Sequence, residues 1–443
     1  MNLGVVADDL TGATDAGSMS AKAGFPTNVY SFIGFRDAGG SAVCVLDTDS
    51  RLDDPSSAYR KVASATDSLV AAGCERFHNK TCSVFRGNIG AEFDAMLDVL
   101  REDFAVVVLG FPKNGRTTVD GVHYVNGVRL EDTAFRNDPV HRMTRSQLVD
   151  ILADQTKRSV SLVGHAVVAR GEAALADAMA AGRERGGYQI IDVPDQAALA
   201  TIARAVQHAA VRVTCGSSAL IEELALTWQA PDAGGLGPGG GSLEPSGSLA
   251  SSGVLEPSGV LLIAGSLTPQ TRQQVERLKL AGIVTLTLDT QALLASATGP
   301  DAAAALARAA TDVLAGGVSV LVQADDRPTA VAATQAAGAK RGLDAAATAR
   351  LVSGALAQVA QECRDLVGLS RLVVAGGDTS AAVCRRLGVD ALRVMHDVAP
   401  GVPVCRTLAG PPLLAVFKSG SFGRPEFLLD AVASLQEVHA WTA

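Results

Sequence analysis

The chain has 443 residues, longer than one ordinary domain, and this length predicts two domains or at most three. Its hydrophobic share of 48% and charged share of 19% exclude a disordered or collagen-like chain. With 38 Lys and Arg against 46 Asp and Glu, the net charge of −8 argues against a general nucleic-acid binder, although a few placed Arg residues can still bind a small anion.

The cysteine pattern and the N-terminus indicate a reduced, cytoplasmic protein. The seven cysteines are odd in number and none has C-x-x-C spacing, so neither a disulfide framework nor a zinc site is expected. Asp8 and Asp9 interrupt the N-terminal apolar run, unlike a signal peptide, and no stretch reaches the roughly 20 apolar residues of a membrane span. We therefore expect neither a membrane nor a nucleic acid as partner.

In the first half of the chain, short β-branched runs alternate with helical stretches. Strands are expected over residues 3–7, 42–46, 105–109, 189–192 and 211–214. Helices are expected over residues 13–23, 56–72, 91–100, 196–209 and 218–227. This alternation is typical of an α/β domain, in which helices cover a parallel or mixed sheet.

Residues 230–258 are dominated by Gly, Ser and Pro, and the segment LEPSG begins at residue 243 and again at 255. Such a segment buries too little apolar area to offset its ordering entropy, so it is predicted to be a linker. It contains a G-x-G-x-x-G match, Gly235–Gly240, without the preceding strand and following helix that a dinucleotide site requires. The predicted domains are therefore residues 1–229 and 259–443.

The second half repeats the alternation of strands and helices. Strands are expected over residues 260–264, 284–288, 318–322, 372–375 and 413–417, and helices over 269–280, 301–314, 345–367, 379–387 and 426–436. The predicted fold class is α/β, with two α/β domains, parallel or mixed sheets and a ligand cleft between the domains. Ligands of open α/β sheets bind beyond the carboxyl ends of the strands, so the loops at these ends are the candidate site.

The loop after the first strand carries two adjacent acids, Asp8 and Asp9, and Thr11-Gly12 then open a helix. Two carboxylates at a strand end that faces a helix N-terminus can hold a hydroxyl, a metal or a proton. The alternative is that Asp9 or Thr11 is simply the helix N-cap. Since a cap needs one such residue, the second acid favours a functional role.

Cations follow two further strands. VLDTDSRL places Arg51 after a strand that ends in acids, and HNKTCSVFRGNIGAE places Lys80, Arg86 and Asn88 around Gly87 before a helix. Arg binds planar carboxylates through two parallel N–H bonds, so these cations together can form an anion pocket. Each of these cations taken singly is better explained as a surface charge.

The segment GFPKNGRTT, residues 110–118, nearly matches the P-loop pattern but has Arg116 in place of the lysine. Pro112 inside the loop, and an Asn-Gly turn at 126–127 in the segment that follows, predict a hairpin rather than a helix, so no P-loop is assigned. His123 and His141 lie in polar sequence without paired spacing, and no metal is assigned to them.

Three strand ends in the second half carry loops suited to phosphate. Ser266 follows one strand, Gly376–Ser380 joins another to a helix, and Lys418-Ser419-Gly420 ends a third. Paired glycines let backbone N–H groups approach a ligand, and a helix N-terminus favours anions. A tight turn capped by Asp378 or Thr379 explains the glycine segment equally well.

The motifs VVADDLTGATDAG, DSR, RGNIGAE, FPKNGRTT, GGDTS and KSGSFG occur in the order typical of the four-carbon acid sugar kinase family, which the chain resembles over nearly its whole length. The resemblance implies an N-terminal domain for a sugar acid and a C-terminal domain for ATP. It also implies phosphorylation of the terminal hydroxyl of an acid of the threonate, erythronate or 3-oxo-tetronate type. One departure is Cys82, which stands where the family usually carries an Asp.

Carried over by position, the resemblance implies two sets of site residues. The substrate set is Asp8, Asp9, Arg51, Lys80, Arg86, Gly87 and Asn88, and the nucleotide set is Ser266, Gly376, Gly377, Asp378, Thr379, Ser380, Lys418 and Gly420. Our hypothesis is that Arg51 and Arg86 hold the substrate carboxylate while Asp8 or Asp9 orients or deprotonates the hydroxyl. Asp378 is a rival base, and Mg²⁺ bridges the nucleotide oxygens.

Other classes of protein stay open. A non-catalytic two-domain sugar-acid-binding protein would explain the anion pocket but not the phosphate-type loops, and a kinase for a related small hydroxy acid would explain both. A nicotinamide-dependent dehydrogenase would require a strand, a G-x-G-x-x-G turn and a helix in sequence, a context that no segment offers. A structural protein would leave the polar strand ends unexplained. A homodimer is left open as the oligomeric state.

Overall fold

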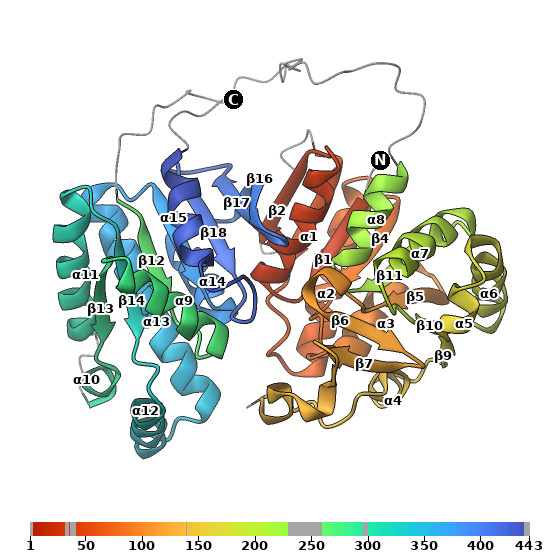
Figure 1. Ribbon diagram of the computed structural model, residues 1–443, viewed down its shortest axis with the longest axis horizontal. Helices are drawn as coiled ribbons and strands as arrows, with labels where there is room; N and C mark the ends of the chain where they lie inside the picture. Colours follow the sequence, from red (N-terminus) through yellow and green to blue (C-terminus); the bar gives the residue numbers. More distant parts are fainter. Residues whose placement is uncertain are drawn as a thin grey trace, which may run out of the picture.

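The computed structural model describes residues 3–31, 35, 41–138, 140–228, 259–295 and 300–437. The predicted linker, residues 230–258, lies outside the described residues, so a domain boundary there stays a prediction. The described residues before and after it form two α/β halves, which we call the N half (up to residue 228) and the C half (from residue 259). The two halves lie side by side in Figure 1.

The N half is built on eight parallel strands with helices on both faces. The strands are β1 (Leu3–Ala7), β2 (Thr27–Ser31), β3 (Val43–Asp47), β4 (Arg76–Lys80), β5 (Phe104–Val108), β9 (Val160–Val163), β10 (Gly187–Ile191) and β11 (Val213–Gly216). The helices are α1 (Leu10–Lys22), α2 (Pro55–Ala71), α3 (Ile89–Leu100), α4 (Leu148–Ala153), α5 (His165–Val168), α6 (Glu172–Arg185), α7 (Gln196–His208) and α8 (Ala219–Trp228). Ten of these elements overlap the predicted ones, so the α/β fold class is confirmed for this half.

A small antiparallel sheet stands beyond β5 and carries the segment that resembled a P-loop. It consists of β6 (Arg116–Val119), β7 (Val122–Val125) and β8 (Val128–Arg129), preceded by the 3₁₀ turn η1 (Pro112–Asn114) and followed by η2 (Leu130–Asp132) and η3 (Ala134–Asn137). Asn126 and Gly127 both have positive φ, 51° and 78°, so the predicted Asn-Gly turn is confirmed between β7 and β8.

The C half has five parallel strands and two antiparallel ones. The strands are β12 (Leu261–Ala264), β13 (Val284–Leu288), β14 (Val320–Ala324), β15 (Arg371–Ala375), β16 (Ala391–Ala399), β17 (Val402–Thr407) and β18 (Leu414–Lys418). The helices are α9 (Pro269–Leu280), α10 (Thr290–Ala295), α11 (Pro300–Ala315), α12 (Pro328–Lys340), α13 (Ala345–Val367), α14 (Gly377–Leu387) and α15 (Phe427–Glu437). The antiparallel pair β16–β17 was not predicted.

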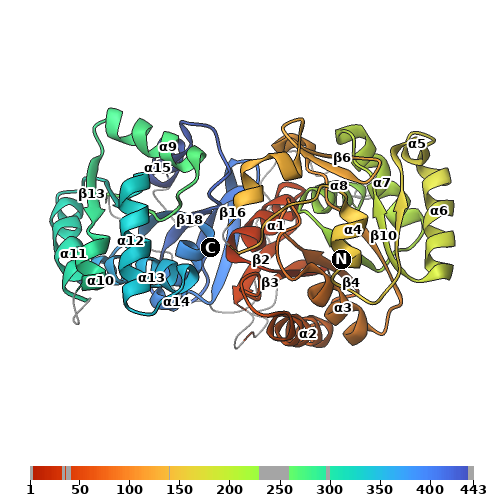
Figure 2. The same ribbon diagram turned by 90° about the horizontal axis from the view of Figure 1, so that it is seen from below.

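Strands β16 and β17 join the two halves into one sheet. The order of its fifteen strands is β13-β14-β12-β15-β18-β17-β16-β2-β3-β1-β4-β11-β5-β10-β9. At the junction β16 pairs antiparallel with β2, with Leu392 opposite Val29 and Ala391 opposite Tyr30. Both views show β16 beside β2 and α1 (Figures 1 and 2). The halves are therefore connected by backbone hydrogen bonds as well as by side-chain packing.

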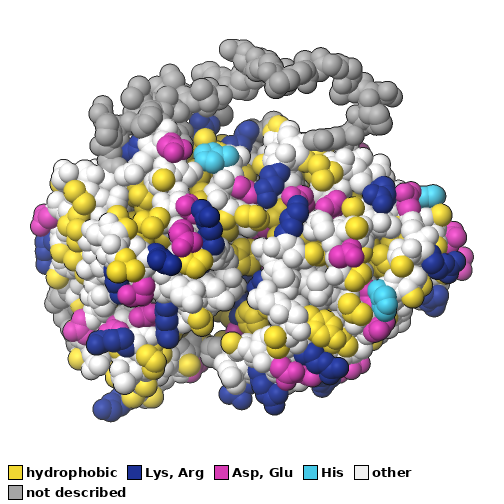
Figure 3. Space-filling view, viewed as in Figure 1, with side chains coloured by type: hydrophobic (Ala, Val, Ile, Leu, Met, Phe, Trp, Pro, Cys, Tyr) yellow, Lys and Arg dark blue, Asp and Glu magenta, His cyan; other side chains and the backbone are white. Residues whose placement is uncertain are grey.

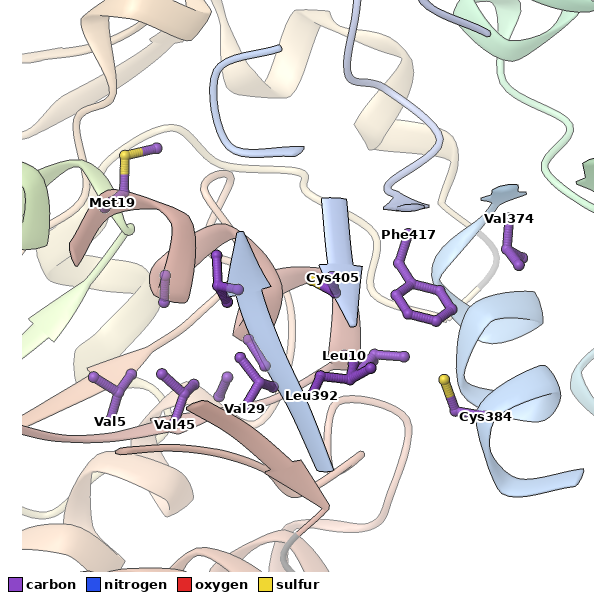
Figure 4. Close-up of a cluster of buried hydrophobic side chains, with 14 of the residues drawn as sticks. Val5, Leu10, Met19, Val29, Val45, Val374, Cys384, Leu392, Cys405 and Phe417 are labelled. Atoms are coloured by element: carbon purple, nitrogen blue, oxygen red, sulfur yellow. The ribbon is translucent and has the colours of Figure 1, made fainter. Parts of the chain in front are cut away.

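The core follows this continuous sheet. Alternate residues of β1 face opposite sides, so that Val5 joins a cluster with α1 while Val6 joins a separate cluster with α2 and α3. The first cluster crosses the junction: Figure 4 shows Val5, Leu10 and Val29 of the N half in the same cluster as Leu392 and Phe417 of the C half, with Cys384 beside them. Burial of one apolar layer by both halves fixes how their strand ends face each other.

The visible surface is mixed in character. On the face in Figure 3, Lys and Arg side chains are interspersed with Asp and Glu side chains, with small hydrophobic patches between them. Within the part of the chain that the structure describes, no helix is both long and apolar enough to span a membrane.

Candidate active site

A pocket lies between the two halves, at loops that follow strand ends. It is lined by side chains that come from α1, from the loops after β3 and β4, from the β6 region and from the loop after β18: Asp9, Thr11, Gly12, Asp15, Arg51, Lys80, Cys82, Ser83, Val84, Arg86, Arg116, Phe135, Ser419, Ser421 and Phe422. Four members of the predicted substrate set, Asp9, Arg51, Lys80 and Arg86, thus meet the KSGSFG loop of the C half in one cavity. Asp8, Gly87 and Asn88 are not among its lining residues.

Arg51 is the centre of an ion-pair cluster at the carboxyl end of β1. Its Nε donates to Asp8 Oδ2 at 2.7 Å and its Nη2 to Asp8 Oδ1 at 2.6 Å, while Nη1 pairs with Asp9 Oδ2. The backbone N–H of Arg51 also donates to the carbonyl of Asp8, at 3.2 Å. Because this fork holds both carboxylates, the guanidinium assigned to the substrate carboxylate is occupied within the protein.

Asp9 is the N-cap of α1 and a site residue at once. Its Oδ1 accepts the N–H of Gly12 at 2.6 Å, and its Oδ2 accepts the hydroxyl of Thr11 at 3.1 Å. Burial alone would raise its pKa, but the charges of Arg51 and Lys80 and these hydrogen bonds hold the pKa of Asp9 below its ordinary value. The capping role named in the sequence analysis is therefore confirmed, and the functional role of the same side chain stays a prediction.

Lys80 and Asp15 form a second buried pair. Lys80 Nζ lies 3.6 Å from Asp15 Oδ2, which also accepts the hydroxyl of Ser218 at 2.6 Å. Asp15 Oδ1 is buried and has no hydrogen-bond partner among the described residues. Burial raises the pKa of Asp15 to about 6 against the lowering effect of Lys80. Asp15 was quoted in the first motif but given no role, and only its position one turn after Gly12 on the same helix face signalled it.

Arg86 is held by groups that the sequence did not point to. Its Nη1 pairs with Asp138 at 2.5 Å, its Nε lies 3.4 Å from Cys82 Sγ, and its guanidinium stands 5.2 Å from the ring centre of Phe135. Burial raises the pKa of Cys82, but Arg86 and Arg51 outweigh it and leave the thiol pKa below its ordinary value. Asp138 lies 52 residues from Arg86 in a loop without a motif, so no local signal could have identified it.

Gly87 and Asn88 pack against the residues and the loop that carry the ion-pair cluster. Gly87 has a φ of 117°, and a Cβ there would lie 3.4 Å from Arg51 Cγ and 3.6 Å from Asp8 Oδ2. Asn88 Nδ2 donates to the carbonyls of Ser50 and Asp53, at 3.2 and 2.9 Å. Asn88 therefore fixes the loop that carries Arg51, and its predicted contact with substrate stays a prediction.

In the C half, three strand ends converge on the glycine turn. Gly376, with a φ of 128°, donates its N–H to the carbonyl of Lys418, and a Cβ on it would lie 3.2 Å from the backbone nitrogen of Ser266. A Cβ on Gly420 would lie 2.4 Å from Ser266 Oγ. Ser266, Gly376 and Gly420 are therefore neighbours, as the nucleotide set requires, and the turn leads directly into the N-terminus of α14.

The polar residues after the glycine pair differ in what they face. Ser380 Oγ donates to the carbonyl of Gly376 at 2.8 Å and so braces the turn. Thr379 Oγ1 lies 3.5 Å from Ser353 Oγ and would be 2.1 Å from a Cβ on Gly265. Asp378 is in the first turn of α14, and burial and the charge of Asp9 raise its pKa. Predicted nucleotide contacts of these three residues are not tested by this geometry.

Lys418 is buried beneath the same turn. Its Nζ donates to Thr271 Oγ1 at 3.1 Å and to the carbonyls of Ser419 and Gly420 at 2.8 and 3.0 Å. Burial lowers its pKa to about 7. The ammonium thus stabilises the KSGSFG loop through hydrogen bonds to its carbonyls. The local sequence could not distinguish this structural role from the predicted contact with a phosphate.

The two predicted sets face each other directly. A Cβ built on Gly377 would lie 3.3 Å from Asp9 Oδ2 and 3.8 Å from Thr11 Oγ1. On the rim, Arg385 of α14 pairs with Asp49 after β3. His141, which was not assigned to a site, donates a hydrogen bond from its Nε2 to the carbonyl of Arg51, 2.7 Å away. The geometry brings an acid-and-arginine cluster within contact distance of a glycine turn at a helix N-terminus.

Two protein-family models match the two halves of the chain separately. A family model described as a sugar-binding N-terminal domain matches residues 3–224, and one described as a nucleotide-binding C-terminal domain matches residues 261–428. The chain is therefore an α/β protein whose N half matches a family of sugar-binding domains and whose C half matches a family of nucleotide-binding domains.

Several curated relatives extend over nearly the whole chain. A 3-oxo-tetronate kinase of Cupriavidus necator is 35% identical over 98% of this chain and 97% of its own length, and that of Methylobacterium radiotolerans is 35% identical over 97% and 99%. A putative tRNA synthase from Salmonella typhimurium LT2 has a similar structure, with a TM-score of 0.79, 25% identity and coverage of 98% and 99%. The chain belongs to the four-carbon acid sugar kinase family, and the predicted resemblance is confirmed.

Proposed function

We propose that this chain is an ATP-dependent kinase that transfers the γ-phosphoryl group to the terminal hydroxyl of a four-carbon sugar acid, of the type that its curated relatives' name describes. The observation that carries the proposal is the approach of Gly377 to Asp9, at 3.3 Å from a Cβ position to a carboxylate oxygen. This contact places the start of α14 against the acid cluster. A phosphate bound at the start of α14 would therefore be adjacent to a hydroxyl bound by the acid cluster.

The acid cluster would position the acceptor hydroxyl. Asp8 and Asp9 both pair with Arg51, and their carboxylate oxygens can accept hydrogen bonds from a substrate hydroxyl. The lowered pKa of Asp9 makes it a weak base, whereas the raised pKa of Asp378 suits a group that takes up the hydroxyl proton. We therefore assign orientation to Asp8 and Asp9 and proton acceptance to Asp378.

The C half would hold ATP through backbone groups. No side chain caps the start of α14, and the first N–H groups of a helix have no intrahelical partners, so these groups would be available to a phosphate. Ser266 and Gly420 stand beside them with hydroxyl and backbone donors. The Asp9 carboxylate and the Thr11 hydroxyl, which lie beside Gly377, are the hard oxygen ligands that Mg²⁺ prefers, so they fit a nucleotide-bound Mg²⁺. When bound, that ion supplies charge neutralisation on the phosphates.

The test is ADP release from ATP with a panel of four-carbon acids that includes 3-oxo-tetronate, threonate and erythronate. We expect one or more acids to stimulate ADP release by the wild type. Asp378→Asn is expected to lower kcat/KM tens-fold or more, since it removes the proton acceptor. Asp430→Asn, which alters an acid in the first turn of α15, is the control and should leave kcat/KM unchanged. Binding of an acid without ADP release would instead indicate a non-catalytic sugar-acid-binding protein.

A further inference from the structure

The cations of the pocket differ in whether the protein already neutralises them. Arg51 pairs with Asp8 and Asp9, Arg86 pairs with Asp138, and Lys80 lies near Asp15. A carboxylate from a ligand would have to compete with these internal partners. Arg116, the fourth cation of the lining, has no ion pair with any of the residues that the structure describes.

Arg116 is nevertheless buried, with 7% of its surface exposed. Its Nη1 donates to the carbonyl of Asn114, and its Nε is buried with no hydrogen-bond partner among the described residues. An unpaired buried cation is costly, and burial lowers the pKa of Arg116 accordingly. Such a group is expected where a ligand of opposite charge completes it.

The fold places this guanidinium firmly. Arg116 begins β6 and exchanges two backbone hydrogen bonds with Phe111, at 2.8 and 3.0 Å, so its Cα is fixed. Its guanidinium lies 6.0 Å from the ring centre of Phe422, in the KSGSFG loop of the C half. The side chain therefore reaches from the N half across the pocket toward the C half.

We propose that Arg116 is the residue that binds the carboxylate of the acid substrate, in place of Arg51 and Arg86. This inference rests on the proposed function. The planar fork of an arginine pairs with a carboxylate through two parallel N–H bonds, and the free Nε provides one of them. Anchoring the carboxylate at Arg116 leaves the cluster of Asp8, Asp9 and Arg51 to the hydroxyl end of the same molecule.

The test measures binding of the acid to the full chain by calorimetry without ATP, using the acid that gives most ADP release or, failing that, threonate. Arg116→Met is expected to weaken acid binding on the order of 10- to 100-fold, the range for loss of a charge-assisted pair. Binding of the matching four-carbon polyol, which has an alcohol in place of the carboxylate, should change less than about 3-fold. Nucleotide binding should be unchanged, because the anion recognised is the acid.

Two further variants separate recognition from folding. Arg116→Lys keeps the charge without the fork and should recover part of the affinity. Arg183→Met is the matched control, because Arg183 also donates to backbone carbonyls and lies over an aromatic ring, that of Phe104, but outside the pocket. The melting temperature of Arg116→Met should equal or exceed that of the wild type, since a buried unpaired charge is removed.

The possible results divide cleanly. Equal losses for the acid and the polyol, a loss confined to the nucleotide, or wild-type acid affinity in Arg116→Met would each overturn the assignment, as would a wild type that binds no acid. If the wild type binds acid through Arg116 but releases no ADP, the assignment of Arg116 stands and the kinase proposal fails. If the wild type releases ADP and Arg116→Met binds the acid as tightly as the wild type does, the kinase proposal stands and the assignment of Arg116 fails.

Discussion

At the scale of single residues, the site depends on which charges are already paired. The sequence predicted that Asp8, Asp9, Arg51, Lys80 and Arg86 lie together, because they lie at or after strand ends. The structure brings the last four of them to one pocket, and Asp8 pairs with Arg51. The sequence could not predict that Asp138 would neutralise Arg86 or that Arg116 would stay unpaired. Pairing between residues far apart in the chain depends on loop conformation, and the loop that holds Asp138 has no periodic pattern.

Glu92 gives a pH test of the site's electrostatics. It is buried in α3 and accepts the hydroxyl of Ser50 at 2.7 Å, and burial, followed by the charge of Asp8, raises its pKa to about 8 from 4.5. The folded protein thus retains a proton that the unfolded chain releases between about pH 4.5 and 8, so stability falls as the pH rises through that window. Glu92→Gln cannot ionise and escapes this loss.

We expect the stability of Glu92→Gln relative to the wild type to increase from pH 5 to pH 8, measured by urea unfolding at both values. Glu276→Gln, at an exposed position of α9 paired only with Lys279, should show no such trend. If the stability of Glu92→Gln relative to the wild type stays constant or falls between pH 5 and pH 8, Glu92 is already ionised in the folded protein and the prediction is wrong.

At the scale of elements, local patterns identified most helices and the hydrophobic strands. Strands such as β1 and β15 are continuous apolar runs, as expected for parallel strands covered on both faces. Strand β4 was not predicted, because its sequence, RFHNK, is polar, although four of its five residues are buried. His78 and Lys80 of this strand are buried because they take part in hydrogen bonds of the site and its surroundings, which hydrophobic periodicity does not record.

Helix α13 offers a matched pair of glycine tests. Gly368, its C-cap, has a φ of 65°, a left-handed conformation, and a Cβ there would meet nothing within 4 Å. Gly368→Ala should therefore cost about 1 kcal/mol through backbone strain alone. Gly354 is inside the same helix and equally unhindered, so Gly354→Ala should add about 0.5–1 kcal/mol to the free energy of unfolding. Denaturant unfolding that gave both substitutions the same sign would contradict this assignment of the helix end.

At the scale of the whole molecule, the sequence predicted two α/β domains, and the structure adds that one sheet runs through both. The connection is made by β16, which pairs on one side with β17 and on the other with β2, more than 350 residues away in the chain. No local pattern carries such a pairing, since strand register across two halves is set by tertiary packing. The same junction sets the position of the acid cluster relative to the glycine turn, so it contributes to the geometry of the site as well as to the fold.

Leu392 tests that junction. It lies opposite Val29 across the β16–β2 pair, is 2% exposed and belongs to the core cluster that spans both halves. Leu392→Ala should lower the free energy of unfolding by about 2–5 kcal/mol, because it opens a cavity in a shared core. Calorimetry should show one transition shifted as a unit. Two separate transitions, with only the C half affected, would mean that the halves fold independently.

The most direct measurement of the central claim is phosphorus NMR of the reaction of wild-type protein, ATP and Mg²⁺ with the four-carbon acid that stimulates ADP release most. If the acid cluster and the glycine turn act on one substrate, a phosphate monoester should form whose phosphorus couples to the two protons of a terminal CH₂ group, in step with ADP. Inorganic phosphate as the only product, or no loss of ATP with any acid of the panel, would contradict the proposed transfer.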